Sequence, residues 1–343
     1  MTQGYGDYYQ RRRVLITGGA GFIGSNLARR LVELGADVLI IDSLIRDYGG
    51  NLFNLTDIRD RVTVNISDVR DENAMHYLVQ GRDVIFNLAG QVSHLDSMND
   101  PYTDLEINCR SQLSLLEACR KYNGGVKVVF AGTRQVYGHP EHLPVTEKHL
   151  VRPVDVNGIN KVAGEYYHLL YNDVFKVRAC SLRLTNVYGP RQLVRHNRQA
   201  FIGWFIRLAV EDGEIQIFGD GSQRRDLVYV DDAAEAFLLA GALDRCNGSV
   251  YNVGGMDATS LDDLAHLLIK VAGSGRIRHV PWPSEKRAID IGSFHTDSTK
   301  FQSEVGWSPQ IALKEGLSRT VDYYRRHLAH YVDDNPSNST GGT

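Results

Sequence analysis

The chain has little cysteine, no long apolar run and no marked excess of one charge. Its four cysteines, Cys109, Cys119, Cys180 and Cys246, are scattered without the spacing of a metal site. We therefore expect no bound metal, and buried free thiols at Cys109, Cys119 and Cys180, which lie in apolar-periodic segments. The net charge is only −3, which predicts neither a nucleic-acid partner nor a membrane surface.

We also expect no signal peptide, and the sequence contains no apolar run of the length that spans a bilayer. These absences favour a cytoplasmic enzyme. Hydrophobic residues make up 43% of the sequence, which is ample for one large domain or two interlocked ones. We expect the basic run at residues 11–13 to be a solvated flank and the polar tail at residues 333–343 to be disordered.

What the chain does have is a glycine-rich turn near its beginning. Residues 14–17 form an apolar run typical of a buried parallel strand, and Gly18-Gly19-Ala20-Gly21-Phe22-Ile23-Gly24 follows directly. Residues 25–34 then have helical periodicity. Glycines permit a tight turn and a close approach of the backbone to a pyrophosphate, whose charge is attracted to a helix N-terminus.

A second apolar strand, residues 36–41, ends at Asp42, 18 residues after Gly24. A carboxylate at this position accepts hydrogen bonds from an adenosine ribose and repels a 2′-phosphate. The glycines alone could form only a tight strand–helix turn. Together with both strands, the helix and the terminal acid, they predict a dinucleotide site that prefers NAD to NADP.

Strand-like and helix-like segments alternate through the first half of the chain. The strand-like segments are residues 62–66, 84–88, 126–131 and 177–184, and the helix-like segments are residues 72–79, 102–122 and 158–172. After Asn186 the order is less regular, with helices at residues 199–211 and 231–243 and strands at residues 215–218 and 250–253. The pattern predicts an α/β fold, a Rossmann-type doubly wound parallel sheet with a smaller interleaved C-terminal substrate-binding lobe.

The expected division assigns residues 1–186, with about 226–250, to an NAD-binding Rossmann domain. Residues 187–225 and 251–332 form the smaller lobe. We expect the ligand to lie between the two parts, over the carboxyl ends of the strands.

Further motifs follow the glycine turn in a characteristic order. They are SDVRD at residues 67–71, NLAGQ at 87–91, RLTNVYGPR at 183–191, FGDGSQ at 218–223 and YVDD at 229–232. With these motifs the chain resembles the extended short-chain dehydrogenase/reductase superfamily, in particular its NAD-dependent nucleotide-sugar epimerases, dehydratases and decarboxylases. The resemblance runs from about Val14 to Tyr324 and implies that the smaller lobe binds a nucleotide-diphosphate sugar.

The resemblance also implies a set of cofactor contacts. Asp68 and Val69 would meet the adenine, and Lys161 would hold the nicotinamide ribose. Asn108 would lie near the active-site backbone, and Leu88 would meet the cofactor. The alternative role of Asp68 and of Asn108 is to cap a helix. The alternative role of Leu88 is to pack at the end of its strand. The complete expected set is Gly18, Gly21, Phe22, Ile23, Gly24, Asp42, Asp68, Val69, Leu88, Ala89, Gly90 and Lys161.

Catalysis in this superfamily uses a tyrosine, a lysine four residues later and a serine or threonine. The tyrosinate removes the proton of a sugar hydroxyl while hydride passes to the nicotinamide, and the lysine lowers the tyrosine pKa. Lys161 matches the lysine and Thr133 the hydroxyl residue, but Asn157 holds the tyrosine position. An amide has no titratable proton near neutral pH, so Asn157 can only hydrogen-bond the sugar or a water.

Another group must therefore carry the proton. The candidates are His94, Asp96, Tyr137 and Tyr166, of which we favour His94 or Asp96, because in relatives the loop after residues 87–90 lines the sugar pocket. The two tyrosines are expected to be structural. Arg134 and Gln135 follow Thr133 where family 4,6-dehydratases carry an acidic pair, so a standard 4,6-dehydratase is not expected.

Four residues are candidates for substrate binding. Arg225 and Arg287 match the pair that holds the diphosphate in relatives, a role that suits a planar guanidinium. Asn186 resembles a residue that binds the diphosphate through its amide, and Gln91 is a further candidate. A solvated surface position is the alternative for each arginine.

The leading hypothesis is NAD-dependent epimerisation of a nucleotide-diphosphate sugar by transient oxidation and re-reduction. An unusual dehydratase or decarboxylase and a non-catalytic NAD and nucleotide-sugar binding protein are the alternatives, although the presence of Lys161 and Thr133 argues against a pure binder. The helices at residues 102–122 and 158–172 resemble the pair that forms the subunit interface in this superfamily, so we expect a homodimer.

Overall fold

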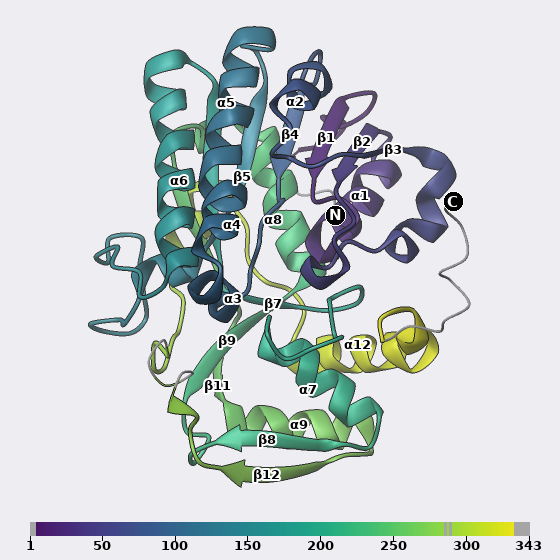
Figure 1. Ribbon diagram of the computed structural model, residues 1–343, viewed down its shortest axis with the longest axis vertical. Helices are drawn as coiled ribbons and strands as arrows, with labels where there is room; N and C mark the ends of the chain where they lie inside the picture. The colour runs from purple at the N-terminus through teal and green to yellow at the C-terminus, as the bar shows by residue number, and fades with distance from the viewer. Residues whose placement is uncertain (1–4, 285–286, 288–289, 333–343) are drawn as a thin grey trace.

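The computed structural model describes residues 5–332 except 285, 286, 288 and 289, and its larger part is built on one parallel sheet (Figure 1). The seven strands have the order β10-β6-β5-β4-β1-β2-β3. The order reverses between β1 and β4, and ligands of such sheets bind over this switch point. The strands are β1 (Arg13–Thr17), β2 (Asp37–Asp42), β3 (Val62–Ile66), β4 (Val84–Asn87), β5 (Lys127–Thr133), β6 (Arg178–Leu184) and β10 (Val250–Val253).

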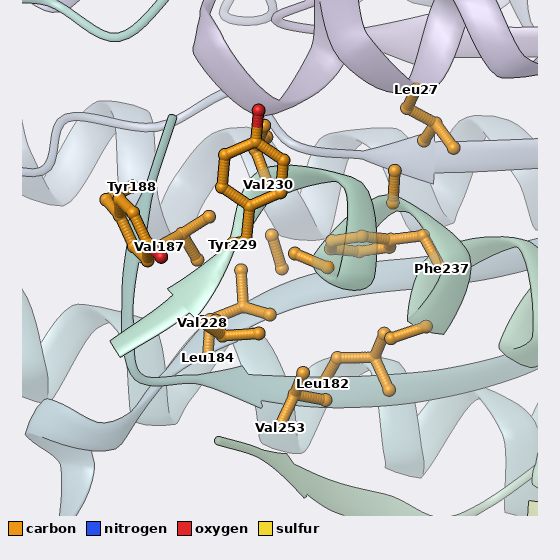
Figure 2. Close-up of a cluster of buried hydrophobic side chains, with 14 of the residues drawn as sticks. Leu27, Leu182, Leu184, Val187, Tyr188, Val228, Tyr229, Val230, Phe237 and Val253 are labelled. Atoms are coloured by element: carbon orange, nitrogen blue, oxygen red, sulfur yellow. The ribbon is translucent and has the colours of Figure 1, made fainter. Parts of the chain in front are cut away.

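Helices cover both faces of this sheet because its strands are apolar on both. Val14 and Ile16 of β1 belong to one buried cluster, whereas Leu15 between them belongs to a second cluster on the opposite face. Figure 2 shows the first cluster, in which Leu27 and Phe237 lie over the strands. The first face carries α1 (Phe22–Glu33) and α8 (Val230–Ala242), and the second carries α2 (Glu72–Leu78), α5 (Ser111–Tyr122) and α6 (Val156–Phe175). The predicted doubly wound fold is confirmed.

The smaller lobe lies beyond the carboxyl ends of the main strands, at the bottom of Figure 1. It contains a three-stranded sheet of order β11-β9-β7 and a parallel pair, β8 and β12. Helices α7, α9 and α12 pack on one another beside these strands. The bounds are β7 (Asn186–Tyr188), α7 (Phe201–Val210), β8 (Glu214–Phe218), β9 (Arg224–Tyr229), β11 (Ala258–Ser260), α9 (Leu261–Ala272), β12 (Arg276–Val280) and α12 (Leu313–His327).

Two expectations about the elements need correction. The helix expected at residues 102–122 consists of α4 (Pro101–Leu105), a π-helical segment (Glu106–Arg110) and α5. The boundary expected near residue 250 assigns residues 251–253 to the lobe, but they pair with β6 in the main sheet, and α11 (Thr299–Val305) packs against them. The rest of the domain division stays a prediction.

The cysteines and the flanks largely follow expectation. Cys119 and Cys180 are buried free thiols, but Cys109, on the π-helical segment, is a free thiol that is only partly buried. The run at residues 11–13 is exposed. Residues 333–343, expected to be disordered, lie outside the described residues. None of the helices in the described ranges has the length and apolar character needed to cross a bilayer.

Candidate active site

A cavity of about 540 Å³ opens over the carboxyl ends of the main strands and reaches the smaller lobe. Its wall contains most of the residues that the sequence predicted to bind cofactor or substrate. These are Gly18, Gly21, Phe22, Ile23, Gly24, Asp42, Asp68, Val69, Leu88, Ala89, Gly90, His94, Thr133, Asn157, Lys161, Asn186 and Arg225. Gln91, Asp96 and Arg287 are not part of this wall.

The glycine turn leaves room for a ligand by bringing its own backbone very close to its neighbours. Gly18 has φ +69°, and a Cβ there would lie 3.0 Å from the Cα of Ala89. A Cβ at Gly24 would lie 2.3 Å from the Gly18 carbonyl oxygen. Helix α1 begins directly after Gly21, which offers no side-chain cap, so its first N–H groups have no partner within the helix. This cradle fits the pyrophosphate of NAD.

Two acids stand at the adenosine end of the cavity. Asp42, at the end of β2, accepts hydrogen bonds from the backbone N–H of Ala20 and of Leu44, each at 2.9 Å. Burial raises the pKa of Asp42, and these backbone donors oppose that effect. Asp68 accepts hydrogen bonds from Arg70, which lower the pKa of Asp68.

Thr17, which the sequence analysis missed, fixes the edge of the cavity. Its hydroxyl accepts hydrogen bonds from the backbone N–H of Leu88 and of Ala89, both at 3.1 Å, and donates to the Asn87 side chain at 2.9 Å. The turn after β4 is thereby held against the end of β1. At its tip, a Cβ on Gly90 would lie 2.9 Å from the Lys161 Nζ, so a larger residue there would have to displace the lysine ammonium.

Lys161 lies on α6 and is almost completely buried beside this turn. Its ammonium donates to the Ala131 carbonyl at 3.2 Å and lies 5.1 Å from the centre of the Phe130 ring. Burial lowers the pKa of Lys161 to about 8, although the nearby carboxylate of Asp104 favours the charged form. The ammonium is therefore poised to lose its proton just above neutral pH.

Asn157 belongs to a buried amide network around Asp104. The Asp104 carboxylate accepts hydrogen bonds from Asn108 and Asn157 at 3.0 Å and from Asn160 at 2.8 Å. The Asn157 amide also donates to the Gln91 backbone carbonyl at 2.8 Å. Because all its neighbours on that side are acceptors, this end of the side chain must be the NH₂ group. Gln91 is thus buried behind Asn157, away from the cavity wall where a substrate contact was expected.

His94 and Asp155 form a pair at the same end of the cavity. The Nδ1 atom of His94 lies 2.9 Å from a carboxylate oxygen of the buried Asp155, which also accepts from the backbone N–H of Gly158 at 2.7 Å and from the Gln135 amide at 2.8 Å. Burial would raise the pKa of Asp155, but His94 and these donors outweigh it and the pKa is lowered. Because Nδ1 lies close to Asp155, Nε2 is the ring nitrogen left for a ligand.

The other candidate proton carriers lie elsewhere. Asp96 is 3.6 Å from the Arg198 guanidinium. Tyr137 is buried, donates to Asn252 and accepts from Arg183, each at 2.7 Å, and burial raises its pKa to about 12. Tyr166 is 53% exposed on the outer face of α6. Of the four candidates, only His94 lines the cavity.

The lobe side of the cavity carries arginines and an amide. Arg225 is buried and paired with Asp290 at 3.0 Å. Asn186 accepts a hydrogen bond from Arg134 at 3.3 Å. Arg287 is exposed and lies outside the cavity wall. That Arg287 and Arg225 together hold the diphosphate therefore stays a prediction. Arg134 belongs to the wall instead, and the sequence analysis gave it no binding role.

Asp104, Asn160 and Asp155 were also missed. Asp155 could have been found as a helix cap, since it directly precedes the residues of α6. Asp104 lies four residues before Asn108, a spacing that places both on one helix face. Nothing in the sequence, however, indicates that α4 and α6 meet there.

Residues 14–254 match the model of the NAD dependent epimerase/dehydratase family. A UDP-glucose 4-epimerase of Mycolicibacterium smegmatis is 35% identical, with 91% of this chain and 98% of that protein covered. A putative UDP-glucose 4-epimerase of Methanocaldococcus jannaschii is 34% identical, with 92% and 99% covered. The crystal structure of the Thermotoga maritima UDP-glucose 4-epimerase with UDP-glucose has a TM-score of 0.83 at 32% identity and covers 92% of this chain and 99% of its own.

The carboxylate of Asp42 generates a prediction about cofactor choice. We expect the protein to bind NAD and to bind NADP poorly, because a 2′-phosphate would meet a buried anion. Asp42→Asn should bind NAD about 10-fold more weakly, which is in the range for the loss of a hydrogen bond to a charged group. The ratio of NAD affinity to NADP affinity should also become smaller. Isothermal titration calorimetry measures both. Asp37→Asn, at the exposed beginning of the same strand, is the matched control, and equal NAD and NADP affinities of the unmodified protein would contradict the assignment.

Proposed function

The chain belongs to the NAD-dependent epimerase/dehydratase family, and from this premise we propose that it epimerises a nucleotide-diphosphate sugar by transient oxidation and re-reduction at C4. The similarity to proteins named UDP-glucose 4-epimerase over nearly their whole length supports the reaction and the carbon. Bound NAD would supply the acceptor and donor of the hydride. Epimerisation needs no further acid–base pair, in keeping with Arg134 and Gln135 where dehydratases of the family carry acids.

The observation that carries the proposal is the convergence of two sets of groups on one cavity. Lys161, Thr133 and His94 stand over the sheet, and Asn186 and Arg225 stand on the lobe side. A sugar between these sets would place its reacting hydroxyl toward Thr133 and its diphosphate toward Arg225. A non-catalytic binder would have less need of Lys161 and Thr133 together at one cavity wall.

His94 is the group that we assign to proton transfer. In the oxidation, the O4–H proton of the sugar would pass to Nε2 of His94, the C4–H bond would break as hydride leaves toward the cofactor, and the C4–O4 bond would become a carbonyl. The keto sugar would then rotate in the site so that its other face meets the cofactor. Hydride would return to that face of C4, and His94 would return the proton to O4. The Asp155 carboxylate, 2.9 Å from Nδ1, stabilises the imidazolium between these steps.

Asn157 has a positioning role in this proposal. Its NH₂ group is engaged by Asp104 and the Gln91 carbonyl, so it holds the beginning of α6 in place. Its oxygen has no hydrogen-bond partner among the residues that the structure describes and is free to accept from the sugar or a water. Lys161, one helical turn further along α6, supplies positive charge beside the reacting oxygen.

Substitution of His94 tests the proton route. His94→Gln retains hydrogen bonding but not titration, so turnover of a UDP-glucose and UDP-galactose panel, followed by NMR, should fall by about 100- to 10,000-fold, the usual contribution of general acid–base catalysis. Asp96→Asn, on the same helix α3 (His94–Asn99), should retain activity. The reverse pattern would transfer the role to Asp96. Binding without turnover across UDP, dTDP, CDP and GDP sugars would favour the non-catalytic alternative.

The lowered pKa of Lys161 predicts a limit at alkaline pH. Below about pH 8 the ammonium is charged and stabilises negative charge on the reacting oxygen; as the pH rises through about 8 the charge is lost and kcat/KM should fall about 10-fold per pH unit. A pH profile of kcat/KM with saturating NAD measures this. A flat profile well above pH 8 would show that the charge of Lys161 does not assist the reaction.

A homodimer is the proposed assembly. Helices α5 and α6 lie side by side at the outer edge of the molecule (Figure 1). Their outer faces, with the adjoining α4, expose large apolar side chains to an extent that a monomer would not require. These are Tyr102, Leu105, Tyr122, Ile159, Tyr166, Leu170, Val174 and Phe175.

Light scattering at micromolar protein concentration tests the assembly. We expect the mass of two chains, and the mass of one chain for Leu170→Asp, because a charge in the centre of a helix-packed interface is costly to bury. Met256→Asp, at a similarly exposed apolar position on the smaller lobe, should remain dimeric. A monomeric unmodified protein would refute the proposal.

A further inference from the structure

Arg134 is a cation in the cavity wall. It begins η4 (Arg134–Tyr137), directly after Thr133. Its Nη2 donates to the Asn186 side chain at 3.3 Å, and its guanidinium lies 5.0 Å from the centre of the Phe294 ring. Its Nη1 is buried and has no hydrogen-bond partner. Among the residues that the structure describes, no carboxylate forms an ion pair with it.

The other arginines of the wall differ in this respect. Arg225 is paired with Asp290 at 3.0 Å and also donates to the Gly292 carbonyl. Arg198 lies 3.2 Å from Asp47 and 3.6 Å from Asp96. Burial lowers the pKa of Arg134 to about 9, and the neighbouring Arg225 contributes in the same direction, whereas the carboxylates of Asp226, Asp290 and Asp155 favour the charged form without forming an ion pair with it. Arg134 therefore stays charged at neutral pH. A desolvated charge of this kind is costly unless an anion completes it.

The position of Arg134 selects which anion of a nucleotide sugar it would meet. Thr133 and Arg134 are consecutive, with Cα atoms about 3.8 Å apart, and Thr133 is the residue that we place at the hydroxyl of C4. The diphosphate is attached to C1, across the ring from C4. A carboxylate carried on C5 is instead a neighbour of C4. The planar guanidinium, with Nη1 unengaged, suits two parallel hydrogen bonds to such a group.

We propose that Arg134 binds a carboxylate on C5 of the sugar, and that the substrates of this protein are therefore nucleotide-activated uronic acids. The inference rests on the proposed function, because it takes the nucleotide-sugar site as given and names the class of sugar. The contact of Arg134 with Asn186 makes the diphosphate the competing anion. The carboxylate and the diphosphate would each bind the guanidinium through negatively charged oxygens, and the test distinguishes the two.

Calorimetry on the NAD-loaded protein provides the test. UDP, dTDP, CDP and GDP are titrated first to identify the preferred nucleoside diphosphate, and its glucose and glucuronate forms are then compared. We expect the glucuronate form to bind about 10- to 100-fold more tightly than the glucose form, the range for hydrogen bonds to charged groups. Arg134→Gln should abolish this difference while leaving the affinities for the glucose form and the bare diphosphate within about 3-fold.

Two control measurements accompany the test. Arg224→Gln changes an exposed arginine of the lobe that is outside the cavity wall and should keep the preference for glucuronate. Unchanged NAD affinity shows that Arg134→Gln is folded.

Three outcomes would overturn the inference. If the unmodified protein binds the glucose and glucuronate forms with equal affinity, the protein does not recognise the carboxylate. A uniform loss for all three ligands in Arg134→Gln assigns the arginine to the diphosphate. If no nucleoside diphosphate binds, the proposed function is wrong and the inference fails with it. This result differs from failure of the inference alone, in which a nucleoside diphosphate binds but the glucuronate form has no advantage.

Discussion

The carboxylate of Asp104 is buried between α4 and α6 and accepts hydrogen bonds from the side chains of Asn108, Asn157 and Asn160. A buried carboxylate tolerates this position only if donors surround it. Two of the three donors lie on the first turns of α6, the helix that also carries Lys161. The geometry of the reacting end of the cavity therefore depends on this anion, which joins the first turns of α6 to α4 and favours the charged form of Lys161.

This network also holds Asn157 in place at the beginning of α6. Asn157 does not project an unused amide toward the ligand; its NH₂ group is committed to Asp104 and to the Gln91 carbonyl. Nearby, His94 is paired with Asp155, which is itself held by the first turn of α6 and by Gln135. Asn157 and the histidine pair therefore meet at the same end of α6.

The two ends of the cavity follow different physical rules. At the cofactor end, close backbone packing decides the shape: Gly18, Gly24 and Gly90 stand where any Cβ would meet a neighbouring atom at 3.0 Å or less. At the lobe end, the distribution of charge decides it, because Arg225 forms an ion pair with Asp290 whereas Arg134 forms none within the described residues and keeps a buried Nη1 without a hydrogen-bond partner. The first end accordingly suits a ligand recognised by shape, and the second a ligand recognised by its anion.

The sequence by itself determined the alternation of strands and helices, the glycine turn and the acid at the end of β2. Each of these depends on neighbours within a few residues, and periodicity and steric rules act over that range. Only the tertiary structure decided that Gln91 lies behind Asn157, that His94 meets Asp155, and that Arg134 rather than Arg287 lines the cavity. His94 and Asp155 are 61 residues apart in the chain, and their contact exists because α3 packs against α6. No local pattern contains that information, since burial and pairing of charges are properties of the assembled layers.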